Sequence, residues 1–265
     1  HLEKCMRYFA LISYNGSGFF GWQKQAKSNN TVQYHIDSTL SMLLREPIFS
    51  MGCGRTDTGV HASGYYLHFD VQSVFEVKNI IYKLNQILPP QIVVHDIFPV
   101  REDLHSRFNA ISRSYVYRIK TYKDPFDHLH YYYKSGELDL DKLNEVAELI
   151  KDKTDFFSYC KSMDPGKTTN CIITHSLWKK VNNTYEFHIS ANRFLRGMIR
   201  LLVGMMLNYN KGKITIDNIE ASFIQKDQLP QIWSAPADGL ILHKILYDEK
   251  LNINEAALLT VPTFE

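Results

Sequence analysis

One short stretch of the chain concentrates residues that can do chemistry. From Gly52 to Ala62 the sequence reads G-C-G-R-T-D-T-G-V-H-A, so that Arg55, Asp57 and His61 fall within seven residues. A neighbouring guanidinium favours the ionised form of a carboxyl group and lowers its pKa. A carboxylate held in that form can act as a nucleophile or as a base. The glycines allow a tight backbone course, and loops at strand ends often hold catalytic groups on a rigid scaffold.

The same loop has two other interpretations. An isolated aspartate often caps a turn, and Asp57-Thr58-Gly59 also matches the D-T-G of aspartic proteases. Protease chemistry needs two carboxylates that share a proton, but D-T-G occurs once in the 265 residues. A protease would therefore have to be a dimer. Arg55-Thr56 also fits poorly to the apolar strand that leads into that motif.

The cysteines and histidines do not have the spacing of a metal site. The four cysteines include no C-x-x-C, and the eleven histidines include no H-x-x-x-H or H-E-x-x-H. We therefore expect reduced thiols and no structural metal.

Basic residues are concentrated in two segments, although the formal net charge is only +2. Segment 101–123 has six basic and two acidic residues, and segment 192–213 has five basic residues and no acidic one. Acidic residues predominate in segments 137–155 and 214–255. Such segregation suits a polyanion bound in one groove, although solvated helix faces also produce charge runs.

Tyrosines alternate with other residues between two arginines in the segment S-R-S-Y-V-Y-R, residues 112–118. On a strand, Tyr115 and Tyr117 would share one face, as in sheets that stack nucleobases. A tyrosine pair packed in the core is equally compatible with this pattern.

Hydrophobic patterns predict an α+β fold made of two similar halves. The first half has the order β, α, β, β, α, β, which is the plan of ferredoxin-like domains. Its predicted strands are 7–14, which ends in a turn at 15–18, then 48–52, a strand from residue 65 with an alternating pattern, and 91–98. Its helices start near residue 31, with Asn30 or Thr31 as the cap, and cover 80–88. The second half repeats this plan with strands 114–122, 174–181, 185–191 and 240–247 and helices 139–150, 193–209 and 217–225. Strands 174–181 and 185–191 are predicted to form a hairpin that turns at Asn182-Asn183. We predict domains at 6–104 and 105–250 and a tail at 251–265.

The longest strongly apolar run, residues 198–207, has ten residues and is interrupted by Arg200. A bilayer span needs about 20 residues. We therefore expect no membrane span, and without a recognisable export signal we expect a cytoplasmic protein.

Six ordered motifs, spread over residues 7–247, resemble those of the tRNA pseudouridine synthase A family. They are Y-N-G-S…G-W-Q at 14–23, G-R-T-D-T-G-V-H-A at 54–62, H-S-R-F-N-A at 105–110, R-S-Y-V-Y at 113–117, F-L-R-G-M-I-R-L-L-V-G at 194–204 and A-P-A-D-G-L at 235–240. The departures from the family pattern are Asn15 for Asp, Leu104 for Phe, Ile199 for Val, and Ser158-Tyr159 where D-F-x-S-F is typical.

This resemblance implies an isomerase that converts uridine to pseudouridine at positions 38 to 40 of the tRNA anticodon arm. It also implies that the enzyme uses no cofactor or metal and acts as a homodimer. The implied fold has two ferredoxin-like or RRM-like halves. Their mixed, mainly antiparallel sheets would join into one large sheet flanked by helices, with an active-site cleft between the halves.

By the match to these motifs, Asp57 is the catalytic carboxylate and Arg200 is expected to pair with it. Tyr115 is expected to stack on the target base and to assist proton removal from its C5. Arg55 is expected to enter the base stack where the flipped nucleotide was, and Leu240 to line the apolar side of the uracil pocket.

Lys24 and His61 complete the set of expected substrate-binding residues. Lys24 and Lys27 lie near the first loop and, with the basic segments, would contact tRNA phosphates. The main alternative to the isomerase is a tRNA-binding module without activity.

Overall fold

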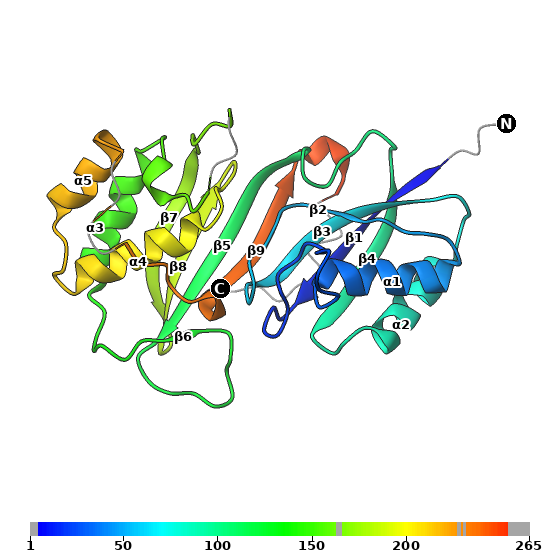
Figure 1. Ribbon diagram of the computed structural model, residues 1–265, viewed down its shortest axis with the longest axis horizontal. Coiled ribbons are helices and arrows are strands. Elements are labelled where there is room, and N and C mark those ends of the chain that lie inside the picture. Colours follow the sequence, from blue (N-terminus) through cyan, green and yellow to red (C-terminus); the bar gives the residue numbers. More distant parts are fainter. Residues whose placement is uncertain (1–4, 163–165, 227–228, 230–231, 254–265) are drawn as a thin grey trace. The chain divides into compact units, whose positions relative to one another are not determined.

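The computed structural model describes residues 5–162, 166–226, 229 and 232–253. In these residues, nine strands of a mixed sheet and five α-helices confirm the α+β class (Figure 1). Contacts divide the chain into two compact units. Unit 1 contains the residues up to Ile111 and those from Ile241 onward, and unit 2 contains Ser112–Leu240.

This division differs from the predicted domain boundaries, for two reasons. Strand β9 (Leu240–Tyr247) pairs in parallel with β3 (His61–Val71), which returns the last strand to unit 1. Ser106 also belongs to unit 1, because its hydroxyl donates to Met51 O at 2.8 Å. Both contacts join residues far apart in the sequence. Most of the predicted tail lies outside the described residues.

The centre of unit 1 is β1 (Met6–Tyr14), which is antiparallel to β3 on one side and to β4 (Ile92–Val100) on the other. Its apolar run is buried, as expected for a strand covered on both faces. The short strand β2 (Met51–Gly52) pairs with β3 on the edge that also receives β9. The predicted strand 48–52 is therefore reduced to two residues.

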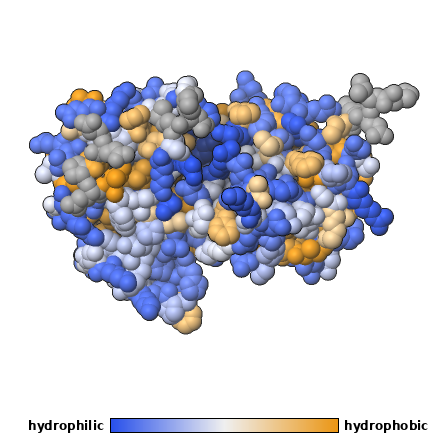
Figure 2. All heavy atoms as spheres, viewed as in Figure 1, coloured by the Kyte–Doolittle hydropathy of each residue, from blue (hydrophilic) through white to orange (hydrophobic). Residues whose placement is uncertain are grey.

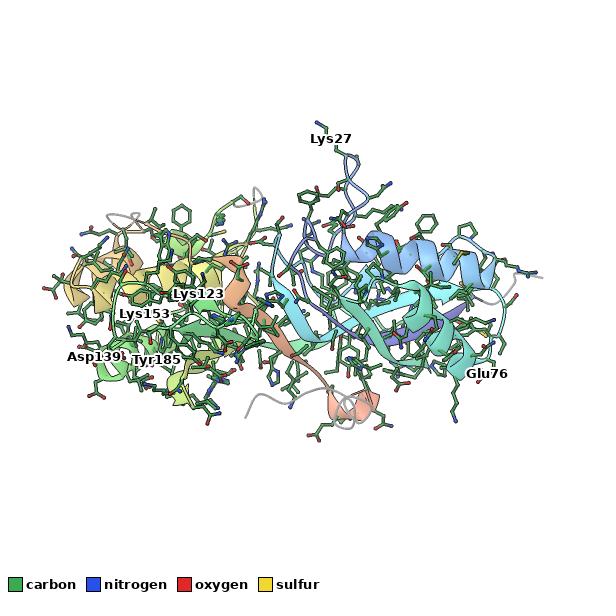
Figure 3. The ribbon with its side chains drawn as sticks, turned by 90° about the horizontal axis from the view of Figure 1, so that it is seen from below. Lys27, Glu76, Lys123, Asp139, Lys153 and Tyr185 are labelled. Carbon is green, nitrogen blue, oxygen red and sulfur yellow. The ribbon has the colours of Figure 1, made fainter. Side chains whose placement is uncertain are left out.

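Two helices of unit 1 follow the predicted periodicity. Helix α1 (Val32–Leu44) is capped by Thr31, whose hydroxyl accepts from Tyr34 N at 3.3 Å. Helix α2 (Val77–Ile87) is capped by Glu76, whose carboxylate accepts from two backbone N–H groups (Figure 3). Their buried residues recur at helical spacing and face the core.

Strand β3 is buried on both faces, although its alternating pattern suggested one buried face. Tyr66 is 1% exposed and packs edge to face on Tyr247, with ring centroids 5.3 Å apart. His68 is 4% exposed, and its Nδ1 accepts from Ser106 N at 3.2 Å. The second face is thus covered by segments that come later in the chain.

In unit 2, β8 (Thr184–Ala191) lies between β5 (Ala110–Lys120) and β7 (Ile173–Val181) and is antiparallel to both. The short strand β6 (Tyr131–Tyr132) pairs in parallel with β5. The predicted β7–β8 hairpin turns at Asn182, which has a φ of 53°.

Three helices complete unit 2. Helix α3 (Leu140–Lys151) is capped by Asp139, and α5 (Ile216–Ile224) by a capping box at Thr215. Helix α4 (Met198–Asn210) starts five residues later than the predicted 193. The reason is Gly197, whose left-handed φ of 72° interrupts helical geometry just before Met198.

On the face drawn in Figure 2, hydrophobic residues form small groups among hydrophilic ones. Among the described residues, no helix combines the length and apolar character that a transmembrane span requires.

Candidate active site

The loop between β2 and β3, residues 53–60, carries the acid and guanidinium groups singled out in the sequence. Segment 16–22 packs along this loop through backbone hydrogen bonds. Trp22 N donates to Thr56 O at 3.2 Å, and Gly59 N donates to Phe19 O at 3.3 Å. Two segments about 40 residues apart in the sequence are therefore packed together.

Two glycines of segment 16–22 permit this close packing. A Cβ on Gly16 would lie 2.0 Å from Val60 O, and one on Gly21 would lie 2.4 Å from Thr56 O. Gly21 also has a φ of 81°, which L-residues with side chains rarely adopt. The sequence predicted only a turn here, whereas the structure shows that these glycines support the loop. By contrast, a Cβ on Gly54 would meet no atom within 4 Å.

The three residues singled out in the motif differ in exposure. Arg55 is exposed, Asp57 is half-buried, and His61 at the end of the loop is only 1% exposed. The Nδ1 of His61 accepts from Gly16 N at 2.9 Å. His61 therefore helps to fix segment 16–22 on the loop, and its predicted contact with substrate stays a prediction.

In unit 2 the two tyrosines of β5 have different environments. Tyr115 is half-buried and packs edge to face against Phe194, with ring centroids 5.3 Å apart. Tyr117 is fully buried, and its hydroxyl donates to Pro236 O at 2.7 Å. Burial raises the pKa of Tyr117 well above its usual value, although the charge of Arg200 opposes this shift. Tyr117 is thus a core residue, and only Tyr115 has exposed surface.

Arg200 lies in the first turn of α4 and is half-buried. Its Nε donates to Ala235 O at 2.7 Å, and Ala235 N donates to Arg200 O at 2.9 Å. Tyr117 also contacts the loop 235–240, through its hydrogen bond to Pro236 O. The loop ends at Leu240, which is 6% exposed. The structure therefore joins the motifs at 113–117 and 194–204 to the motif at 235–240 through hydrogen bonds.

Arg55 and Asp57 thus lie on one loop of unit 1 and His61 at the start of β3 beside it, while Tyr115, Arg200 and Leu240 belong to unit 2. The pairing of Asp57 with Arg200, and the stacking of a base between the two sets, stay predictions.

Lys24 and Lys27 lie on an exposed loop that follows Trp22. Lys27 projects from the loop in Figure 3. The loop is ordered by a bridge between Gln25 and Ser28, and Lys24 Nζ lies 5.6 Å from the centre of the Tyr34 ring. Both ammonium groups are available to solvent, which is compatible with phosphate contacts.

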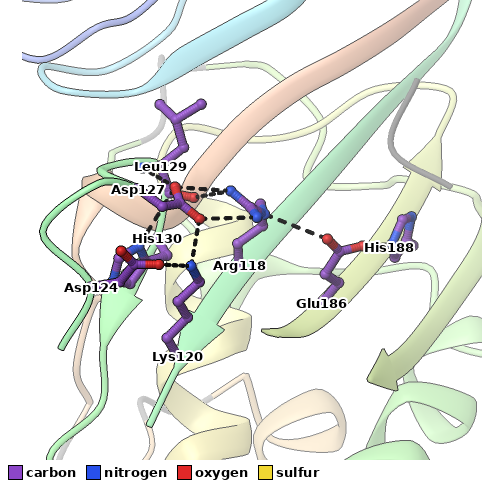
Figure 4. Close-up of polar contacts among 8 residues, drawn as sticks. All are labelled: Arg118, Lys120, Asp124, Asp127, Leu129, His130, Glu186 and His188. Atoms are coloured by element: carbon purple, nitrogen blue, oxygen red, sulfur yellow. Dashed lines mark hydrogen bonds and ion pairs between the residues drawn. The ribbon is translucent and has the colours of Figure 1, made fainter. Parts of the chain in front are cut away.

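Part of the basic segment 101–123 is neutralised within unit 2 (Figure 4). Lys120 Nζ lies 2.5 Å from Asp124 Oδ2 and 2.8 Å from Asp127 Oδ2. Arg118 pairs with Asp127 at 3.2 Å and with Glu186 at 3.4 Å. The sequence count stopped at residue 123, just before the two aspartates that neutralise these cations.

The ion pairs stabilise the charged forms of their members. Burial lowers the pKa of Lys120, but hydrogen bonds to Asp124 and Asp127 outweigh it, so the pKa is raised. Burial raises the pKa of Asp127, but Lys120, the N–H of Leu129 and Arg118 bring it well below its usual range. These cations therefore serve the fold of unit 2, and we do not count them as free positive charge for a polyanion.

Across the described part of the chain, no group of three or more histidine, cysteine, aspartate or glutamate residues could hold a metal ion.

Residues 152–248 match a family model described as tRNA pseudouridine synthase. The chain is 40% identical over 246 residues to tRNA pseudouridine synthase A of Parabacteroides distasonis, and the match covers 92% of this chain and 97% of that protein. It is 38% identical to the protein of the same name from Bacteroides thetaiotaomicron, with 92% of each chain covered. It is 32% identical to that of Chlorobaculum tepidum, with 89% of this chain and 96% of that protein covered. Because these matches extend over nearly the full length of both proteins, the chain belongs to the tRNA pseudouridine synthase A family.

Proposed function

We propose that this chain isomerises uridine to pseudouridine at positions 38 to 40 of the tRNA anticodon arm, with Asp57 as the catalytic carboxylate. Family membership supports the tRNA pseudouridine synthase activity and disfavours the aspartic protease. The observation that supports the role of Asp57 is its place on the loop. The carboxylate is half-buried, two residues from an exposed guanidinium, on a backbone fixed by segment 16–22.

The reaction breaks the bond between C1′ and N1 of uridine and forms a bond between C1′ and C5. C5 loses its proton to solvent and N1 gains one, so the product has the composition of the substrate. Asp57 starts this exchange as a nucleophile or as a base. The detached uracil must stay in the site while it rotates, and a closed pocket lined by Leu240 would hold it in place.

The target nucleotide must leave its base stack before its glycosidic bond can be attacked. Eversion costs a few kcal/mol. In this proposal Tyr115 stacks on the everted base, and the exposed Arg55 fills the space that the base has left. Both contacts offset the cost of eversion, because each replaces part of the lost stacking.

Arg200 is the proposed partner of Asp57. Its Nε donates to Ala235 O, which fixes the plane of the guanidinium. Its terminal nitrogens are the groups that we assign to the carboxylate. Such a pair would keep Asp57 ionised and oriented.

Lys24, Lys27 and His61 are proposed to contact the tRNA. We further propose that the protein acts as a cytoplasmic homodimer. Its two ferredoxin-like halves would join their sheets and leave the active-site cleft between them.

The test is release of tritium from tRNA that carries [5-³H]uridine. The unaltered protein should release tritium, and Asp57→Asn should bind the same tRNA without release. Turnover by Asp57→Asn would contradict the role of Asp57. If the unaltered protein binds tRNA but releases no tritium, the chain is a binding module instead.

A further inference from the structure

Three buried aromatic side chains lie against the catalytic loop. They belong to Tyr14 at the end of β1, Trp22 in segment 16–22 and Tyr65 in β3, and each is at most 3% exposed. The ring centroids of Trp22 and Tyr65 are 4.4 Å apart, and those of Tyr14 and Tyr65 are 5.5 Å apart. The rings form a single packed cluster, so the positions of their polar ends are fixed by the core.

Both tyrosine hydroxyls of this cluster reach the loop. Tyr65 Oη donates to Gly54 O at 2.5 Å, and Tyr14 Oη lies 2.8 Å from Thr56 Oγ1. Gly54 and Thr56 are the residues immediately before and after Arg55. The loop is therefore held on both sides of an arginine whose own side chain is exposed, at the carbonyl of Gly54 and at the side chain of Thr56.

The start of the loop is shaped to admit this cluster. A Cβ on Gly52 would lie 1.9 Å from Tyr65 Oη and 2.6 Å from Trp22 Nε1. Only glycine therefore allows the hydroxyl and the indole to approach the loop this closely. Trp22 N also donates to Thr56 O, which gives Thr56 a second anchor.

We propose that Tyr14 and Tyr65 are positioning residues that hold the loop on both sides of Arg55, through the Thr56 hydroxyl and the Gly54 carbonyl, and thereby direct Arg55 and Asp57 toward the target nucleotide. This inference rests on the proposed function. An arginine that enters a base stack must project from an ordered backbone. If the loop were disordered, it would have to become ordered at each turnover. Asp57 is the next residue after Thr56 and shares the same anchor.

The two hydroxyls should affect the reaction more than tRNA binding. Binding is dominated by contacts to phosphates, whereas the loop acts once the tRNA is docked. Loss of an interaction that matters only after docking lowers kcat and leaves the dissociation constant nearly unchanged.

Tyr65→Phe and Tyr14→Phe keep the rings and remove the hydroxyls. We expect each to lower kcat for tritium release by about 10-fold, with the dissociation constant for tRNA changed by less than about twofold. Amide hydrogen exchange of residues 53–57 should become faster in both variants, which measures loop order without reference to activity.

Tyr247→Phe is the matched control. Tyr247 is also buried in unit 1, and its hydroxyl donates to a backbone carbonyl, Ser106 O, at 2.6 Å. This variant loses the same kind of hydrogen bond, to a carbonyl that is not part of residues 53–60. It should lower the melting temperature about as much as the other two variants and leave kcat and the exchange of residues 53–57 unchanged.

A double-mutant cycle tests the Tyr14 hydroxyl. Thr56→Val removes the other partner of its hydrogen bond, so Tyr14→Phe combined with Thr56→Val should lower kcat no more than one of the two changes alone. The inference is overturned if Tyr65→Phe and Tyr14→Phe match Tyr247→Phe in kcat and exchange. Failure of the proposed function gives a different result from failure of this inference. In that case the unaltered protein would release no tritium, or Asp57→Asn would still release it.

Discussion

Two loops of this chain, residues 53–60 in unit 1 and 121–130 in unit 2, are held in opposite ways. The first is fixed by uncharged groups, namely backbone amides, tyrosine hydroxyls and glycine contacts, and it exposes Arg55. The second is fixed by ion pairs around Lys120 and Arg118, and its most exposed large hydrophobic residue is Phe126, at 94%. The first loop thus leaves Arg55 available to a ligand, whereas the cations that hold the second loop, Lys120 and Arg118, are already paired.

This difference explains why a count of basic residues misjudges an RNA-binding surface. At least three of the six basic residues in segment 101–123 form ion pairs, namely Arg101, Arg118 and Lys120. The position of the acids in space, and not the net charge of a segment, decides which cations can meet phosphate.

The largest expected effect comes from adding one methyl group against the first loop. Gly21→Ala places a Cβ against Thr56 O at a residue with positive φ, so we expect a stability loss of about 3 kcal/mol. The displaced loop should also lower kcat by about 100-fold. Urea unfolding and tritium release measure the two effects.

Gly54→Ala is the control for this change, because its Cβ has open space. It should alter the free energy of unfolding by less than about 0.5 kcal/mol. Equal losses of stability for the two variants would show that the close contact at Gly21 does not support the loop.

The ion pairs of the second loop should contribute stability and not RNA affinity. Lys120→Met leaves two partly buried carboxylates without their main partner, so we expect a loss of about 2 kcal/mol in the free energy of unfolding. The dependence of tRNA affinity on salt should be unchanged. A weaker salt dependence in Lys120→Met would show that this cation meets phosphate after all.

Acid should destabilise unit 1 through the buried His68 of β3, whose Nδ1 accepts from Ser106 N. Burial, with the charges of Arg7 and His105, lowers the pKa of His68 to about 4. The unfolded chain takes up this proton near pH 6.5, so stability is lost as the pH falls from 6.5 toward 4. Wild type should lose roughly 1.5 kcal/mol more than His68→Gln between pH 7 and pH 5 in urea unfolding.

The contribution of Asp37 to the pH dependence of stability has the opposite sign, because burial raises its pKa to about 6. Its ionisation therefore reduces stability as the pH rises from about 4 to 6. The difference between wild type and His68→Gln removes this common contribution. Parallel pH profiles for the two proteins would contradict the assignment to His68.

The smallest effect concerns Lys27 on the exposed loop. Lys27→Ala should lower the slope of log affinity against log salt concentration by about 1, the amount expected for one phosphate contact. Stability and kcat at saturating tRNA should not change. An unchanged slope, as measured by filter binding at several salt concentrations, would remove Lys27 from the tRNA interface.

Local sequence patterns predicted much of the secondary structure. The periodicity placed α1, and of its two candidate caps, Asn30 and Thr31, the structure uses Thr31. Asn182-Asn183 placed the β7–β8 turn. The predicted start of α4 at residue 193 was wrong, because the left-handed conformation of Gly197 has no signature in the hydrophobic pattern. The return of β9 to unit 1 was also missed, because its pairing with β3 joins residues 180 positions apart, such as His61 and Ile241.

For the site, the sequence indicated which residues carry chemistry but not what supports them. Asp57 and Arg55 stand out because charged groups and glycines are dense around them. Tyr14 and Tyr65 do not, since a buried tyrosine in a strand has the same pattern whether or not its hydroxyl reaches a loop. That contact depends on the register between β1 and β3, which only the folded structure defines.

The most direct test of the central claim, that Asp57 on this loop makes pseudouridine, is a map of pseudouridine in cellular tRNA. The host would be a bacterial strain that lacks its own tRNA pseudouridine synthase A, supplied with this chain or with Asp57→Asn at equal protein levels. We predict that only the unaltered chain restores pseudouridine, and only at positions 38 to 40. Restoration by Asp57→Asn, or no restoration by the unaltered chain, would contradict the account.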